Sequence, residues 1–329
     1  MAKPYMHFAL PGTIAEIVEA LCSDRYLQTD SPQIQIHGDV TIRDELKPRY
    51  NISKTLDAPV IYLHEGDGGT QMAVAMMSYG LVPSWNFSVE HTSDASRIAT
   101  VVGNDLANGA WRWKELRRRR CLVPCHGYYF FPLKKEKNQL PSFIKRDDED
   151  VLFMAGIYSV CKGISTFAVV KREVLKTTLP GSTQPIFLES KDEIECWLQD
   201  VGPEATNWND ALSELVIEKH DDKVVPLTHY NVPNTVRDTT KEALSLIQPV
   251  SKQSGSIGAL FAKQRQTQVS TQGSASDPSP SQTLPLTAPR SYDSPSRRRR
   301  VSSKPLVVTQ INRRSVSPEY VSSGSDNES

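Results

Sequence analysis

The sequence predicts an α+β domain over residues 1–250, built mainly of strands with a few helices, and a polar tail over residues 251–329. Two observations lead to this prediction. Up to residue 250, short apolar runs alternate with turn signals, which is typical of packed strands joined by loops. Beyond it Ser, Thr, Gln and Pro dominate, and so few apolar residues cannot bury enough surface to offset the entropy of ordering. We therefore expect the tail to be disordered.

The elements of the domain follow from its apolar spacing. Residues 13–21 come after the turn Pro11-Gly12 and are predicted to form a helix, because their apolar residues recur at helical spacing. An unbroken apolar stretch over residues 59–63 predicts a buried strand. Further strands are expected over residues 71–78, 122–131, 152–158 and 165–170, and further helices over 191–198 and 239–246.

Composition indicates a soluble protein of a reducing compartment, the cytosol or the nucleus. The five cysteines have no disulfide-framework spacing, no signal peptide opens the chain, and no apolar run reaches membrane length. Disulfide-free chains of this kind are typical of reducing compartments. Cys121, Cys125 and His126 suggest a metal site, but no second Cys/His pair follows at a suitable spacing. Neither a metal nor another cofactor is expected.

The net charge of zero hides an asymmetry. The tail holds 11 Lys or Arg and 5 Asp or Glu, which leaves 27 basic and 33 acidic residues in the first 250. A phosphate backbone is bound largely through cationic charge, so a net-acidic domain needs a local basic surface to bind nucleic acid.

The run from Arg119 to Phe131 reads RRCLVPCHGYYFF and resembles the RRCLVPADGFYEW signature of the SRAP family, the SOS response-associated peptidases that crosslink themselves to abasic DNA. Five further segments resemble family motifs in the correct order: residues 48–53, 79–85, 153–158, 165–170 and 185–188 with the Trp197-Leu198 pair that follows. The resemblance implies a mainly antiparallel, barrel-like sheet with a few flanking helices.

The resemblance also implies a chemistry and the residues that perform it. In the family an N-terminal cysteine, exposed by removal of methionine, closes a thiazolidine ring with the aldehyde of a ring-opened abasic site. An asparagine, a glutamate and a histidine position the sugar and move protons. In this chain the cysteine falls on Ala2, or on Tyr5 in a second alignment, and the other three fall on Thr100, Phe130 and Gly181.

These departures predict a catalytically inactive member that keeps the fold. Three alternatives follow: a nuclear protein that binds DNA or replication partners without crosslinking, an active crosslinker or peptidase with a different N-terminus, and a pure protein-interaction module. The first is preferred, because an error in the first exon cannot also change Thr100, Phe130 and Gly181.

Candidate DNA contacts come from the retained motifs. Arg49 and Asn51 either contact DNA or tie down a turn. Tyr79 and Trp85 either stack on unpaired bases or belong to the core. The basic run Arg117, Arg118, Arg119 and Arg120 is expected to contact phosphates.

The tail carries two further signals. Residues 254–263 resemble a PCNA-interacting box, with Ile257, Leu260 and Phe261 as the apolar anchors of an isolated docking element. Basic clusters over residues 297–314 predict a nuclear localisation signal. We therefore expect a nuclear monomer with single-stranded or abasic DNA, and PCNA, as partners.

Overall fold

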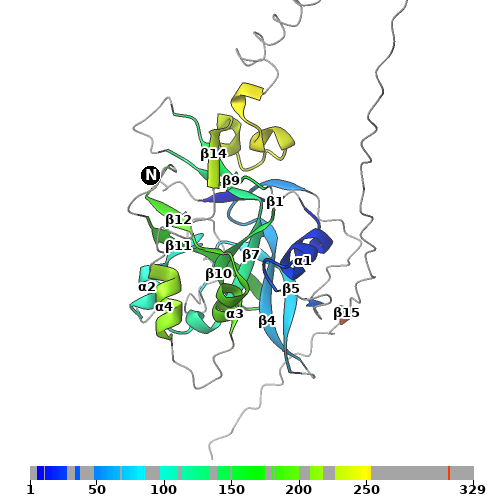
Figure 1. The fold of residues 1–329 in the computed structure, drawn as a ribbon, viewed down its shortest axis with the longest axis vertical. Helices are drawn as coiled ribbons and strands as arrows, with labels where there is room; N and C mark the ends of the chain where they lie inside the picture. Colours follow the sequence, from blue (N-terminus) through cyan, green and yellow to red (C-terminus); the bar gives the residue numbers. More distant parts are fainter. Residues whose placement is uncertain are drawn as a thin grey trace, which may run out of the picture.

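The computed structural model describes most of the first 252 residues and one short strand of the tail (Figure 1). The described residues are 6–10, 12–27, 34–37, 48–66, 69–83, 85, 97–109, 113–132, 139–148, 150–174, 180, 182–199, 208–217, 227–252 and 310–311. Several predicted site residues lie outside them: Ala2, Tyr5, Gly181, Ile257, Leu260, Phe261 and the arginines of 297–300.

Five long strands close into a barrel: β4 (Asp57–Gly66), β5 (Gly69–Tyr79), β7 (Arg120–Cys125), β10 (Leu152–Cys161) and β11 (Ile164–Glu173). They pair antiparallel in the order β11-β10-β7-β4-β5, and a parallel pairing of β5 with β11 joins the two ends. The expected α+β fold with a mainly antiparallel, barrel-like sheet is thereby confirmed (Figure 1).

Shorter strands extend the barrel at its edges. β6 (Thr100–Val102) runs parallel to β11, β12 (Thr183–Pro185) pairs with the far end of β11, and β13 (Phe187–Leu188) pairs with β10. On the other side β2 (Ile34–His37) runs parallel to β5, and β15 (Gln310–Ile311) runs parallel to β2.

A second antiparallel sheet has the order β14 (Leu227–Asn231), β9 (Ser142–Arg146), β8 (Gly127–Phe130), β1 (His7–Leu10) and β3 (Arg49–Ile52). The single strand predicted over residues 122–131 is therefore wrong, because β7 belongs to the barrel and β8 to this sheet. Gly127 permits the change of sheet: a Cβ there would lie 2.5 Å from the Phe143 ring and 2.6 Å from the Ile144 carbonyl oxygen.

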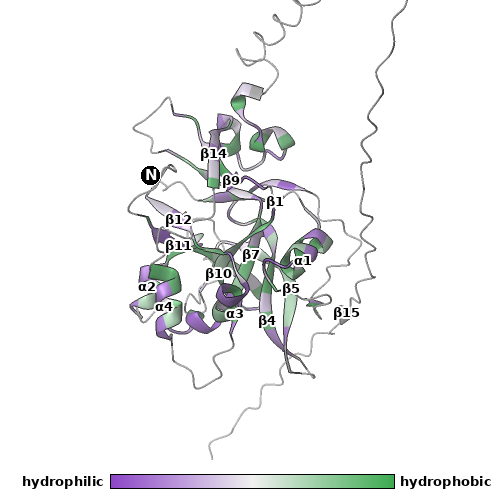
Figure 2. Ribbon diagram, in the orientation of Figure 1, coloured by the Kyte–Doolittle hydropathy of each residue, from purple (hydrophilic) through white to green (hydrophobic). Residues whose placement is uncertain are grey.

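Two of the predicted helices are confirmed. α1 (Ile14–Cys22) begins with a capping box in which Thr13 accepts from the Glu16 N–H and Glu16 accepts from the Thr13 N–H. It buries Ile14, Ile17, Val18 and Leu21, and Figure 2 shows apolar and polar residues side by side on it. α3 (Lys191–Leu198) is capped by Ser190. α2 (Gly103–Ala107) and α4 (Asp210–Ile217) pack against each other.

The helix predicted over residues 239–246 is wrong. That region holds short 3-10 turns instead, η6 (Asn234–Arg237), η7 (Leu244–Ile247) and η8 (Val250–Lys252). The backbone and hydroxyl of Thr240 donate to the Asp238 carboxylate, and the Asp238 and Lys241 carbonyls accept from a side chain of β3. These local and long-range bonds compete with the helical ladder. Leu246 is the one fully buried residue among 239–246, so little packing favours a helix there.

The core has two parts. The larger fills the barrel and extends under α1, α3 and α4. The smaller lies between the second sheet and the 3-10 turns, and consists of Ala9, Tyr129, Phe131, Phe143, Val232, Val236 and Leu246. The chain that follows β14 is therefore packed onto the sheet that contains β1.

Candidate functional site

The first described strand lies at the centre of the domain. β1 pairs with β8 on one side and with β3 on the other. The carbonyl of Met6, directly before β1, accepts a hydrogen bond of 2.9 Å from the Tyr79 hydroxyl at the end of barrel strand β5. The strand that follows Ala2 and Tyr5, the positions matched to the reacting cysteine, is thus paired within the second sheet and tied to the barrel through Met6.

Asn51 of β3 is completely buried, and its amide is fully used inside the protein. Its nitrogen donates to the carbonyls of Val236, Asp238 and Lys241 at 3.1, 3.0 and 3.4 Å. Its oxygen lies 2.8 Å from Nδ1 of His7 on β1. Of the two interpretations of Asn51, this geometry favours the one in which it ties down a turn.

Arg49, at the start of β3, is partly exposed and lies 3.9 Å from the Glu242 carboxylate. The same carboxylate accepts the Tyr50 N–H at 2.8 Å. Arg49 therefore also faces the segment that follows η6, although its partial exposure leaves it available to a phosphate.

Tyr79 is fully buried, stacks on Phe167 at 5.2 Å, and meets Phe8 edge-on. Its position favours the core interpretation over base stacking. Trp85 is partly exposed, and its ring lies 6.0 Å from the ring of Trp113. Of the two aromatic candidates, Trp85 is the one with part of its surface exposed to solvent.

The basic run divides into inward-facing and outward-facing arginines. Arg120 is buried and donates to the carbonyls of Trp197 and Gln199 at the end of α3. Arg117 donates to the carbonyls of Leu106 and Ala107 at the end of α2. Both cations complete helix C-termini, which leave carbonyls unpaired and carry partial negative charge. Burial lowers the pKa of Arg117.

Arg118 and Arg119 point outward. Arg118 is exposed, and Arg119 keeps a side-chain exposure of 35% while lying 3.9 Å from Glu115. Of the four arginines, these two present their charge to solvent, on a backbone held in place by Arg117 and Arg120.

Two cationic residues that no sequence motif singled out, Lys54 and Arg97, are in contact at the turn after β3. Lys54 is buried, and its Nζ donates to the carbonyl of Arg97 at 3.4 Å. The Arg97 guanidinium in turn donates to the Ser78 hydroxyl at 2.8 Å. Lys54 directly follows the residues 48–53 that matched a motif, but its partner lies more distant in the sequence, so no spacing rule brings the two together.

The family model of the SOS response associated peptidase (SRAP) matches residues 21–239. This chain belongs to the SRAP family. The abasic site processing protein of Saccharomyces cerevisiae is 26% identical to it over 220 residues, which are 64% of this chain and 55% of the relative. The chain thus spans about half the length of that curated relative.

The SRAP domain also resembles a solved structure. A crystal structure of a protein from Bacteroides thetaiotaomicron has a TM-score of 0.54 to it at 19% identity, covering 74% of this chain and 98% of that one. At this identity the likeness concerns the fold alone.

Two of the positions matched to SRAP reacting groups lie within the described residues. Phe130 ends β8 opposite Ser142 of β9, is partly buried, and packs against the main core. Thr100 begins β6 opposite Val169 of β11 and is also partly buried. Neither side chain can move a proton at neutral pH as a carboxylate or imidazole does.

Raised thiol pKa values make Cys22, Cys121 and Cys125 of the SRAP domain poor nucleophiles. Cys121 and Cys125 are fully buried, and burial raises the pKa of both thiols far above the ordinary value. Burial, with a contribution from Glu19, raises the pKa of Cys22 to about 11. Since the thiolate is the reactive form, none of these three is activated.

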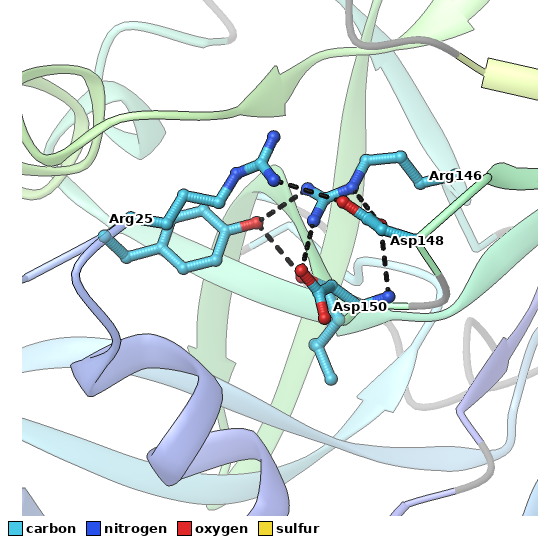
Figure 3. Close-up of polar contacts among 6 residues, drawn as sticks. Arg25, Arg146, Asp148 and Asp150 are labelled. Atoms are coloured by element: carbon cyan, nitrogen blue, oxygen red, sulfur yellow. Dashed lines mark hydrogen bonds and ion pairs between the residues drawn. The ribbon is translucent and has the colours of Figure 1, made fainter. Parts of the chain in front are cut away.

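A cluster of charged side chains around Arg146 is structural (Figure 3). Arg146 at the end of β9 is 1% exposed and contacts Asp148 at 2.6 Å and Asp150 at 2.8 Å. The Tyr26 hydroxyl accepts from Arg146 and donates to the Val151 carbonyl, and Arg25 reaches Asp148 at 3.3 Å. The cluster therefore ties the turn after α1 to the turn between β9 and β10.

The described residues contain no group of three or more His, Cys, Asp or Glu side chains placed to hold a metal ion. Among these same residues, no helix has both the length and the apolar character needed to cross a membrane.

Proposed function

We propose that this SRAP domain binds single-stranded or abasic DNA in the DNA damage response and does so without forming a covalent crosslink. The yeast relative is by name an abasic site processing protein, and the family's name refers to the SOS response. These names support the ligand and the process. The residues at the matched reacting positions support the absence of the crosslink.

The observation that carries the second part is Phe130. The motif resemblance puts a glutamate there, and a general acid or base has to reach the proton that it transfers. In this chain the position holds an apolar ring that packs against the core. Thr100 adds a second loss, because its hydroxyl offers a single donor, whereas a carboxamide offers two donors and a separate carbonyl oxygen.

The thiols support the same conclusion. The position matched to the reacting cysteine is Ala2, or Tyr5 in the second alignment, and neither side chain is the thiol that would close a thiazolidine. Cys121 and Cys125 are sealed in the barrel with raised pKa values and cannot take over that role.

DNA binding is assigned to the outward-facing side chains Arg49, Arg118, Arg119 and Trp85. The three arginines offer positive charge to phosphates, and the indole ring offers a face for stacking. The domain carries more acidic than basic residues, so binding should depend on these local contacts and weaken with salt.

The tail extends the proposal. Basic clusters over 297–314 would direct the protein to the nucleus, and residues 254–263 would dock on PCNA. We propose that the domain ends at residue 250. We also propose that the protein acts as a monomer.

The experiment combines two measurements on the purified full chain. Abasic single-stranded DNA, made with uracil glycosylase, is incubated with the protein and analysed on a denaturing gel. Binding to the same DNA is measured without denaturant by fluorescence anisotropy. We expect binding in the second assay and no shifted, heat-resistant band in the first.

The other outcomes identify the two alternative functions. A heat-resistant band would mean that the chain is an active crosslinker, using groups outside the matched positions. Absence of binding at low salt would favour a protein-interaction module that contacts DNA only through its partners.

A further inference from the structure

Two cationic residues, Lys54 and Arg97, are in contact at the turn between β3 and β4, through the Lys54 ammonium and the Arg97 backbone carbonyl. Lys54 is only 6% exposed, and its Nζ lies 3.4 Å from the carbonyl oxygen of Arg97. Both side chains are cationic, so an anion bound beside this turn would be attracted by each of them.

The Arg97 side chain has binding capacity left over. One terminal nitrogen donates to the Ser78 hydroxyl at 2.8 Å. Its Nε is buried and makes no hydrogen bond. Within the described part of the chain, Arg97 forms no ion pair with a carboxylate. A guanidinium with an unused buried donor and no carboxylate partner is suited to an oxyanion, whose oxygens match its fork of N–H groups.

The turn that places Lys54 is strained. Thr55 has φ of 75°, which is rare for a β-branched residue. The neighbouring strand end holds it there: the Thr55 N–H donates to the Tyr79 carbonyl at 2.7 Å, and the Ser78 hydroxyl donates to the Thr55 carbonyl at 3.2 Å. Such strain persists where the surroundings over-determine it, and it concentrates at ligand sites.

Ser78 therefore connects the pair. Its hydroxyl accepts from Arg97 and donates to the turn that carries Lys54. Gly80, with φ of 102°, completes the arrangement, because a Cβ there would lie 3.0 Å from the Arg97 Cβ. Arg97 can thus lie along the backbone where β5 ends.

We propose that Lys54 and Arg97 form a binding site for a phosphate group of single-stranded DNA. The partly exposed guanidinium of Arg97 would contact the phosphate oxygens, and the buried ammonium of Lys54 would add positive potential from below. The choice of DNA as the source of the phosphate rests on the proposed function. The anion site itself rests on the cationic pair, the unused Nε donor and the strained turn.

The test uses the full chain and two readouts. Anisotropy of a labelled single-stranded oligonucleotide is measured over a range of salt concentrations for the wild type, Arg97→Gln, Lys54→Met and Lys191→Met. Lys191, partly exposed on α3, is the charge-matched control. Arg97→Gln should bind about tenfold more weakly, as expected for loss of a hydrogen bond between charged groups. Its salt slope should fall by about 0.7, whereas Lys191→Met should behave as the wild type.

The second readout is independent of DNA. Inorganic phosphate should raise the melting temperature of the wild type more than chloride does at matched ionic strength, and should not do so for Arg97→Gln. If phosphate stabilises the wild type in this way but the wild type does not bind DNA, the proposed function is rejected and the anion site is retained. DNA binding with equal affinity in Arg97→Gln and Lys191→Met would reject the DNA-phosphate site alone. If Lys54→Met does not fold, the comparison of Arg97→Gln with Lys191→Met alone tests the proposed site.

Discussion

The Nδ1 atom of His7 lies 2.8 Å from the side-chain oxygen of Asn51 in the interior of the domain. The three carbonyls that accept from the Asn51 nitrogen fix the orientation of the amide. Its oxygen must therefore accept, and Nδ1 of His7 must carry the proton. One residue of β3 thus connects β1, at the start of the chain, to the segment 236–241 near the end of the domain.

Replacing Asn51 by leucine should destabilise the protein by roughly 2–3 kcal/mol, because buried carbonyls and a ring N–H lose their partner at once. The free energy of unfolding, measured by urea denaturation, checks this. Asn104→Leu, at an exposed position of α2, is the matched control and should remain close to the wild type. Equal losses in the two variants would contradict the role assigned to Asn51.

The sequence indicated which helices and strands form, but not which distant segments form hydrogen bonds with one another. The α1 region and the barrel strands carry their own apolar period, so they could be predicted. The segment 239–246 has helical spacing, yet side chains of Asp238 and Asn51 compete for its backbone. Local propensity is a weak prior against such contacts.

The same limit applied to the candidate site. Arg117 and Arg120 share a basic run with Arg118, but the carbonyls that they satisfy belong to helices elsewhere in the chain. A charge run in a sequence does not show which of its members turn inward. Lys54 and Arg97 were missed for the converse reason, since their proximity depends on β3, β5 and the turn at Thr55.

The Arg146 cluster predicts an acid dependence of stability. Burial raises the pKa of Asp148, but the hydrogen bonds from Arg146 and the Asp150 N–H outweigh it, so the pKa lies below its ordinary value. Because the pKa of Asp148 is lower in the folded than in the unfolded protein, its carboxylate stabilises the fold at pH values above the unfolded pKa of about 3.9. That stabilisation is lost as pH falls through the folded pKa.

Asp148→Asn should therefore lower stability at neutral pH by roughly 0.5–1 kcal/mol, a modest value because the carboxylate is partly exposed. The loss relative to wild type should shrink as the pH falls below about 4. Urea denaturation at a series of pH values measures both effects. Asp147→Asn, at the exposed neighbouring residue, is the control. A loss that stays constant with pH would show that Asp148 acts through packing rather than charge.

Restoring the thiol alone should not restore a crosslink. Ala2→Cys supplies the nucleophile, but Thr100 and Phe130 still cannot position a sugar or transfer its protons, and groups that act as a unit are strongly non-additive. The denaturing gel with abasic DNA should show no stable band for Ala2→Cys. A band as strong as that of an active family member would mean that the substitution at residue 2 alone accounts for the absence of the crosslink.

Deleting residues 297–300 should move the protein out of the nucleus, since these four adjacent arginines are the densest basic cluster of the tail. Fluorescence microscopy of a tagged full chain measures the distribution. Deletion of residues 286–289, which removes the same length of tail without a charge, is the control. An unchanged distribution in the 297–300 deletion would reject this cluster as the signal.

The last prediction concerns docking on PCNA through Ile257, Leu260 and Phe261. Residues three and four apart share one face of a helical turn, so the three side chains can enter one apolar pocket together. Gly255 and Gly258 disfavour a preformed helix, and the ordering cost should keep the affinity modest.

Replacing Leu260 and Phe261 by alanine should weaken binding of a peptide spanning residues 252–266 by about tenfold or more, because buried apolar anchors dominate small interfaces. Lys263 and Arg265 should speed association with an acidic surface and make it sensitive to salt. Fluorescence polarisation against PCNA measures both effects, with alanines at Ser254 and Ser256 as the matched control peptide. If the double-alanine peptide at 260 and 261 binds as well as the wild type, or if neither binds, the resemblance to a docking box is accidental.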